Sequence, residues 1–158
     1  MTERSAVHGT FVIERSYPAS PQRVFKAWSD PAAKARWFVG PHDQWKEQHR
    51  EFDFRVDGRE CVSGVWPGGK VSTFDCLYHD IVPDQRIVYS SGMHADEVRI
   101  SVSLATVEFK PAGAGARLIF TEQAAFLDGY DDSGSREQGT GALLDKLGTE
   151  LQRAGAHP

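Results

Sequence analysis

The sequence lacks several features that would assign it to common functional classes. Its 158 residues include only two cysteines, Cys61 and Cys76, which are too few for a disulfide framework. No apolar run approaches the roughly 20 residues that cross a bilayer, and residues 1–10 contain no apolar segment of a signal peptide. The formal net charge is −4, which argues against nucleic-acid binding as the main role. These absences predict a cytoplasmic protein with no membrane span and no nucleic-acid partner.

The motifs of common metal and cofactor sites are also missing. The six histidines show neither H-x-H nor H-E-x-x-H spacing, and the cysteines form no C-x-x-C pair. Residues 64–70 repeat the glycine and lysine spacing of a phosphate-binding loop, but Val71 stands where that loop needs Ser or Thr. A hairpin turn explains this segment better. We therefore expect no metal site and no cofactor.

The composition that is present is that of an ordinary folded domain. Hydrophobic residues make up 40% of the chain and charged residues 25%. This length predicts one domain over residues 1–158, with a core from about 9 to 154. Such a domain buries roughly 70% of the surface of its unfolded chain, so it can hold one core and still contain a hollow.

The first forty residues predict a strand followed by two short helices. Apolar and polar residues alternate over 9–17, which is typical of a strand with one buried face. Ser20 before Pro21 and Asp30 before Pro31 are start signals for helices, and the second helix should end near Trp37. Six segments rich in β-branched and aromatic residues follow, separated by turn signals: 47–56, 59–66, 70–82, 86–91, 98–110 and 116–125. Short turns between strands predict an antiparallel meander.

The chain ends in a helix whose apolar stripe is Leu143, Leu144, Leu147 and Leu151. Ser135 and Gln138 fit a capping box at its start, with Ser133 as an alternative start. Gly141 and Gly148 lie near the stripe, and they indicate either space left under the helix or close packing on the sheet. The result is an α+β protein, in which a curved seven-stranded antiparallel sheet wraps around a long C-terminal helix.

Small polar residues occur on a strand face that should point inward. Ser101 and Ser103 share the face of Val107 and Phe109, where a packed core would use larger side chains. The opposite face is also partly apolar, through Ile100, Val102 and Leu104. That outer face would meet either the N-terminal helices or a neighbouring subunit, so a homodimer is one interpretation.

Glu122 is the one weak candidate for a catalytic group. It shares a strand face with Leu118 and Phe120, which places it in the interior or at its mouth. A buried carboxylate is costly unless it is paired, and such groups are often catalytic or orient a ligand. The alternative is a position at the sheet edge with an Arg partner. Tyr78, Tyr89 and Met93 fit either a ligand wall or simple core packing.

Eight short stretches together resemble a known superfamily. They read YPASP (17–21), VFKAWSDP (24–31), RWF (36–38), EFDFRVDG (51–58), YHDIVP (78–83), RIVY (86–89), TVEF (106–109) and TEQ (121–123). In order and spacing they resemble START/Bet v 1-like (SRPBCC, helix-grip) proteins, and within these the branch related to the C-terminal domain of the activator of Hsp90 ATPase. The resemblance spans about residues 9–151.

This resemblance implies the helix-grip fold and a hydrophobic cavity between the sheet and the last helix. Members bind lipids, polyketides, hormones or other apolar molecules; some are cyclases and some are cochaperone modules. Many relatives open the final helix with Gly-Trp, where this chain has Gly139-Thr140. No catalytic set is shared across the branch, so the resemblance transfers only ligand-lining positions, by location: Trp37, Phe38, Phe54, Tyr78, Tyr89, Glu122, Phe126, Leu144 and Leu147.

We therefore predict a binding protein for a small hydrophobic ligand, such as a lipid or polyketide. Its predicted site consists of the transferred positions together with Met93, Ser101 and Ser103. Two alternatives stay open. One is a cyclase or hydrolase that uses Glu122 as acid or base, and the other is a chaperone-interaction module.

Overall fold

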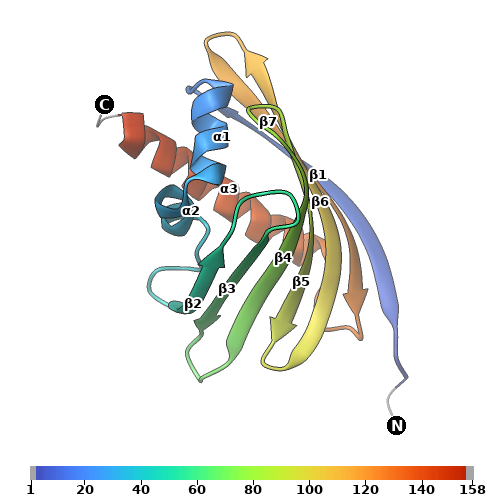
Figure 1. The fold of residues 1–158 in the computed structure, drawn as a ribbon. Coiled ribbons are helices and arrows are strands. Elements are labelled where there is room, and N and C mark those ends of the chain that lie inside the picture. The colour runs from blue at the N-terminus through green and yellow to red at the C-terminus, as the bar shows by residue number, and fades with distance from the viewer. Residues whose placement is uncertain (1–2, 156–158) are drawn as a thin grey trace.

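A seven-stranded antiparallel sheet forms the body of the protein, and all three helices pack on its concave face (Figure 1). The computed structural model describes residues 3–155. The elements are β1 (Ala6–Tyr17), α1 (Pro21–Ser29), α2 (Pro31–Trp37), β2 (Lys46–Phe52), β3 (Arg59–Val65), β4 (Val71–Val82), β5 (Arg86–Ala95), β6 (Val98–Ala112), β7 (Gly115–Leu127) and α3 (Ser133–Gly155). This order confirms the predicted architecture.

The strands follow one another across the sheet, except that β1 closes the far edge. The order is β1-β7-β6-β5-β4-β3-β2, and every neighbouring pair is antiparallel. Residues 66–70 join β3 to β4 as a hairpin, in which the Trp66 amide donates to the Lys70 carbonyl over 2.8 Å. The meander and this hairpin were both predicted from the turn signals.

Three predicted strand boundaries were wrong by three or four residues. β1 begins at Ala6 instead of residue 9, because residues 6–8 pair with the end of β7. β2 ends at Phe52 instead of continuing to residue 56, because the chain already turns at Arg55, whose carbonyl accepts from the Gly58 amide over 2.8 Å. β5 continues to Ala95 instead of ending at residue 91, because Gly92 and Met93 pair with strands on both sides. Pairing on two sides offsets the weak strand propensity of glycine. The turn is thereby confined to Asp96 and Glu97.

The helix starts are fixed by side-chain caps. Ser20 Oγ accepts from the Arg23 amide over 3.2 Å, and Asp30 Oδ2 accepts from the Ala33 amide over 2.9 Å, as predicted. The predicted capping box at Ser135 is wrong. α3 begins at the alternative start, Ser133, because Asp132 Oδ1 accepts the Ser135 amide at 2.8 Å. Hydrogen bonds from Ser135 lower the pKa of the Asp132 carboxyl group.

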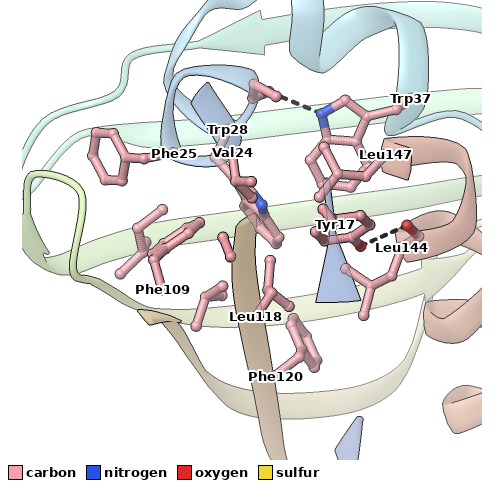
Figure 2. Packing of buried hydrophobic residues seen from close by; sticks show 14 of the residues in the cluster. Tyr17, Val24, Phe25, Trp28, Trp37, Phe109, Leu118, Phe120, Leu144 and Leu147 are labelled. Carbon is pink, nitrogen blue, oxygen red and sulfur yellow. Dashed lines mark hydrogen bonds between the residues drawn. The ribbon is translucent and has the colours of Figure 1, made fainter. Parts of the chain in front are cut away.

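The core occupies much of the space between the sheet and the three helices (Figure 2). Trp28 and Trp37 meet edge-on with ring centroids 4.8 Å apart, and the Trp37 indole donates to the Ala27 carbonyl over 2.8 Å. Tyr17 donates to the Leu144 carbonyl over 2.7 Å, which ties β1 to α3. The N-terminal helices therefore form part of the same core as α3.

The glycines of α3 serve close packing. A Cβ at Gly141 would lie 3.1 Å from Arg15 Nη2, and one at Gly148 would lie 3.3 Å from Tyr17 Cε1. Both glycines thus let α3 approach β1. Of the two predicted explanations, close packing is correct, and the idea that these glycines leave space under the helix is wrong.

No helix within residues 3–155 covers the outer face of the sheet. Val12, Val102 and Leu104 are 53%, 44% and 39% exposed. The predicted contact of this face with the N-terminal helices is wrong, because α1 and α2 lie on the other side of the sheet (Figure 1).

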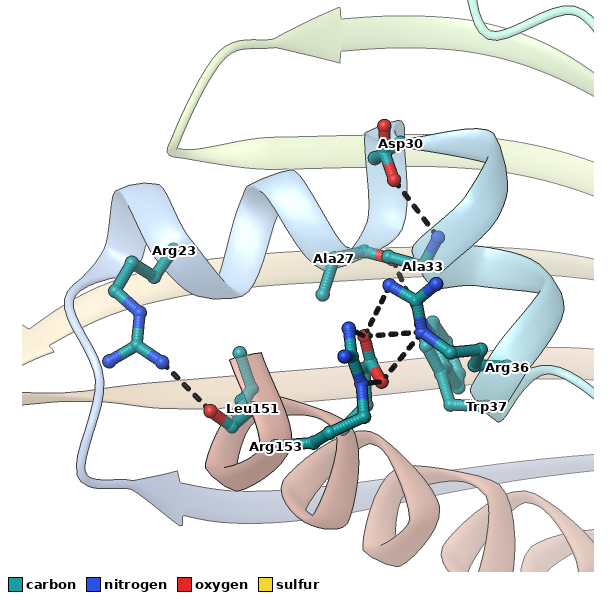
Figure 3. A network of polar contacts seen from close by, with 9 residues as sticks. Arg23, Ala27, Asp30, Ala33, Arg36, Trp37, Leu151 and Arg153 are labelled. Carbon is teal, nitrogen blue, oxygen red and sulfur yellow. Dashed lines mark hydrogen bonds and ion pairs between the residues drawn. The ribbon is translucent and has the colours of Figure 1, made fainter. Parts of the chain in front are cut away.

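A charged cluster fixes the C-terminal half of α3 to α1 and α2 (Figure 3). Glu150 is 5% exposed and accepts from Arg36 Nε over 2.9 Å and from Arg153 Nε over 2.8 Å. Arg23 Nη2 donates to the Leu151 carbonyl over 2.8 Å. This end of α3 is therefore held to both N-terminal helices.

Glu150→Gln is expected to lower the free energy of unfolding by roughly 2 kcal/mol at neutral pH. Hydrogen bonds from Arg153 and Arg36 lower the pKa of Glu150 from 4.5 to about 2. A carboxyl group whose pKa is lower in the folded state stabilises the fold fully at a pH above its ordinary pKa. This stabilisation is lost as the pH falls through the pKa of the folded state. The difference between wild type and variant should therefore shrink as the pH falls from about 4.5 to about 2.

Urea unfolding at a series of pH values measures this difference. Glu97→Gln, which removes an exposed carboxyl outside the cluster, is the control. A Glu150→Gln penalty that stays constant over that pH range would contradict the assignment.

Candidate functional site

A cavity of about 500 Å³ lies between the sheet and the N-terminal half of α3. Its floor comes from the inner faces of β3, β4, β5 and β7, and one side comes from α2 and the segment that follows it, residues 38–45. The cavity is thus at the opposite end of α3 from the Glu150 cluster, where the helix is not fixed by α1 and α2.

The cavity wall is mainly apolar and rich in aromatic side chains. Eight aromatic side chains border it: Trp28, Trp37, Phe38, Trp45, Trp66, Phe74, Tyr89 and Phe120. Aromatic rings and aliphatic side chains with a few polar groups are the usual lining of a small-molecule site.

Trp45 fits a slot made by two glycines. A Cβ on Gly64 would lie 1.9 Å from Trp45 Cε2, and one on Gly40 would lie 2.5 Å from Trp45 Cγ. Either position with a side chain would push the indole away. Trp45 Nε1 and Trp66 Nε1 both donate to Ser72 Oγ, over 3.3 and 3.0 Å, which orients the two rings at this end of the cavity.

The segment after α2 is tied down on both sides. Lys146 Nζ, on α3, donates to the carbonyls of Val39 and Gly40 over 2.7 and 3.2 Å. Arg50 Nη2, on β2, donates to the Phe38 carbonyl over 2.9 Å. Partial burial lowers the pKa of Lys146. These bonds hold residues 38–40 against the cavity.

A polar cluster occupies the other end of the cavity. Arg136 Nη1 donates to Glu122 Oε2 over 3.0 Å, and Arg136 Nη2 donates to Ser101 Oγ over 2.6 Å and to Asp131 Oδ2 over 3.0 Å. Ser103 Oγ also donates to Glu122 Oε2, over 2.9 Å. The cluster joins β6, β7 and α3, so Glu122 is an interior residue with an Arg partner.

Glu122 and Tyr89, on the cavity wall, both have unused hydrogen-bonding capacity. Both residues border the cavity, and neither Glu122 Oε1 nor the Tyr89 hydroxyl makes a hydrogen bond to any residue within 3–155. Burial, with the nearby Glu122 charge, raises the pKa of Tyr89 well above its usual value of 10.0. Tyr89 therefore presents a neutral phenol, which can donate and accept.

The acid–base hypothesis for Glu122 requires a partner that can exchange a proton. Within the described residues, the hydrogen bonds of Glu122 come from Arg136 and Ser103, and none comes from a His, a Tyr or a second carboxyl group. Asp131 contacts the same guanidinium from its other nitrogen. Within residues 3–155, no proton-transfer partner is hydrogen-bonded directly to Glu122.

A second buried polar cluster lies behind the cavity wall. Lys34 Nζ and the Tyr78 hydroxyl both donate to Glu60 Oε1, over 2.9 and 2.6 Å, and the Lys34 and Glu60 side chains are at most 3% exposed. Lys34 Nζ also lies 4.5 Å from the ring centroid of Phe38 and 5.2 Å from that of Trp28. The cluster fixes α2, which carries one wall of the cavity, to β3 and β4.

The predicted site residues fall into three groups. Six border the cavity: Trp37, Phe38, Tyr89, Met93, Glu122 and Leu144. Three stand behind its polar end: Ser101 and Ser103 bind Arg136 and Glu122, and the Phe126 ring lies 5.4 Å from the Arg136 guanidinium carbon. Phe54, Tyr78 and Leu147 lie in the core away from the cavity, so the structure does not bring them to this site.

Sequence reasoning missed the residues that shape the two ends of the cavity. At the aromatic end these are Trp45, Trp66 and Phe74, and at the polar end Arg136 and Asp131. Phe74 had a signal, since it shares the β4 face of Cys76 and Tyr78. Arg136 had none, because an Arg in the first turns of a helix reads as a surface residue.

A curved antiparallel sheet that holds a long C-terminal helix over a cavity defines a helix-grip protein of the Bet v 1-like superfamily. Within it, the family described as activator of Hsp90 ATPase homolog 1-like protein matches residues 18–152, and the chain belongs to that family. Such a fold serves as a ligand-binding or activator-type module. No match was found among curated proteins.

Solved structures of bacterial proteins share the fold over nearly the full length. An uncharacterised protein from Rhizobium leguminosarum is 45% identical with a TM-score of 0.91, covering 96% of this chain and 99% of that one. A protein from Rhizobium loti is 46% identical with a TM-score of 0.85, covering 92% and 99%. A protein from Chromobacterium violaceum is 26% identical with a TM-score of 0.75, covering 90% and 96%. Within residues 3–155, no helix is both long and apolar enough to cross a membrane.

Proposed function

We propose that the protein binds a small, largely hydrophobic molecule in the cavity between the sheet and α3. The observation that carries this proposal is the volume of about 500 Å³, whose wall is mainly apolar and includes eight aromatic side chains. That volume lies within the usual range for small-molecule sites, roughly 300–1,000 Å³. The few polar groups on the wall, chiefly Glu122, Arg136 and Tyr89, would orient the ligand.

Filling the cavity from α3 is expected to abolish binding. Thr140 borders the cavity and is 9% exposed, so Thr140→Trp would place an indole in the ligand space. We expect wild type to bind the uncharged fluorescent probe N-phenyl-1-naphthylamine, and Thr140→Trp to bind it at least about tenfold more weakly. Fluorescence titration of the probe measures both affinities.

The matched control is Gln138→Trp, which adds the same side chain at an exposed position of α3 outside the cavity. It should bind the probe as wild type does. A wild-type protein that gives no saturable signal, or a Thr140→Trp variant with unchanged affinity, would overturn the proposal.

A further inference from the structure

The polar end of the cavity has an acceptor that no residue uses. Glu122 Oε2 already accepts two hydrogen bonds, from Arg136 Nη1 and Ser103 Oγ, while Oε1 accepts none from the described residues. A hydrogen bond to a charged group contributes about 1.5–3 kcal/mol when it is formed. The free oxygen therefore favours a ligand group that donates.

Tyr89 is placed to bind the same ligand group. Tyr89 and Glu122 are both register partners of Ala105, so their Cα atoms are two strand spacings apart, about 10 Å. The side chain between them on the sheet is only a methyl group, and both long side chains border the cavity. A hydroxyl group can donate to Glu122 Oε1 and accept from the Tyr89 phenol at once.

The charge at this end disfavours an anionic ligand. Two carboxylates, Glu122 and Asp131, face one guanidinium, and Arg136 already donates to both of them and to Ser101. The other cation on the wall, Lys146, is ten residues further along α3, about 15 Å away, and donates to two carbonyls. A ligand carboxylate beside Glu122 would place two negatively charged hydrogen-bond acceptors next to each other, with no donor between them.

We propose that the ligand is a neutral aromatic or alicyclic molecule with a hydroxyl group, which binds between Glu122 Oε1 and the Tyr89 hydroxyl. This inference rests on the proposed ligand-binding function and specifies its ligand class. The apolar body of the molecule would extend from this hydroxyl toward Trp45 and Trp66, at the other end of the cavity.

Three probes of similar size separate this proposal from its alternatives: 2-naphthol, 2-methylnaphthalene and 2-naphthoate. Their affinities are measured at neutral pH by displacement of N-phenyl-1-naphthylamine. We expect 2-naphthol to bind about tenfold more tightly than 2-methylnaphthalene, and 2-naphthoate to bind most weakly.

Two variants test the assigned atoms. Glu122→Gln should reduce the advantage of 2-naphthol to about threefold or less and increase the affinity for 2-naphthoate. Tyr89→Phe removes only the hydroxyl and should also reduce the advantage of 2-naphthol. This variant leaves the hydrogen bond between Arg136 and Glu122 in place. Glu137→Gln, a neutralised carboxyl at an exposed α3 position off the cavity, should keep the wild-type ranking.

The outcomes distinguish this inference from the proposed function. Equal affinities for 2-naphthol and 2-methylnaphthalene, tightest binding of 2-naphthoate, or no displacement by any of the three would overturn the hydroxyl assignment alone. Failure of N-phenyl-1-naphthylamine itself to bind would overturn both.

Discussion

Glu60→Gln is expected to destabilise the protein by roughly 3–5 kcal/mol, although it replaces one carboxylate oxygen by an amide nitrogen. Lys34 Nζ has Glu60 as its carboxylate partner at 2.9 Å, and both side chains are almost completely buried. Without that carboxylate, the ammonium stays buried among aromatic rings. The aromatic rings attract the ammonium, but they supply neither an opposite charge nor the carboxylate acceptor that it loses.

Urea unfolding measures this loss of stability, and two further variants serve as controls for its cause. Replacing both partners, Lys34→Met with Glu60→Leu, should recover most of the stability, because no unpaired charge remains. Asp53→Asn breaks an exposed ion pair with Arg55 and should cost less than about 1 kcal/mol. A loss below about 1 kcal/mol for Glu60→Gln would show that the Lys34–Glu60 pair is not what fixes α2 to the sheet.

Leu147→Ala is expected to cost about 3 kcal/mol of unfolding free energy, and Leu143→Ala about 1 kcal/mol. Leu147 is 0% exposed in the core, so its truncation leaves a void enclosed by packed side chains. Leu143 is only partly buried and borders the existing cavity, so its truncation enlarges a space that is already present. The same Leu→Ala substitution is therefore expected to lower the free energy of unfolding by different amounts at the two positions of α3.

Thermal and urea unfolding of the two variants provide the comparison. Leu143→Ala should also change the affinity for N-phenyl-1-naphthylamine, whereas Leu147→Ala should leave it near the wild-type value. Equal stability losses, or a binding change confined to Leu147→Ala, would contradict the assigned position of the cavity.

The fold was predictable because its signals are local. Ser20 and Asp30 cap the helices that their positions before proline predicted, and turn residues separate strands that pair with their chain neighbours. The strand alternation also placed Ser101 and Ser103 on the inner face, where both are buried. Some boundaries were missed, such as the extension of β5 past Gly92, which depends on pairing across the sheet, and the start of α3, which depends on the Asp132 cap.

The cavity was less predictable, because a strand pattern gives the face of a residue and not what fills the space above it. Tyr78 and Tyr89 are paired on neighbouring strands and both point inward. Tyr78 contacts the buried Glu60, while Tyr89 borders the cavity. That difference depends on Lys34 and Arg136, which are supplied by helices distant in sequence.

The placement of the indole rings has a practical consequence. The chain has four tryptophans, and all of them border the cavity: Trp28, Trp37, Trp45 and Trp66. Every photon of intrinsic tryptophan emission therefore originates from the wall of one space. The emission maximum and intensity of the unlabelled protein should report directly on whether that space holds water or an organic molecule.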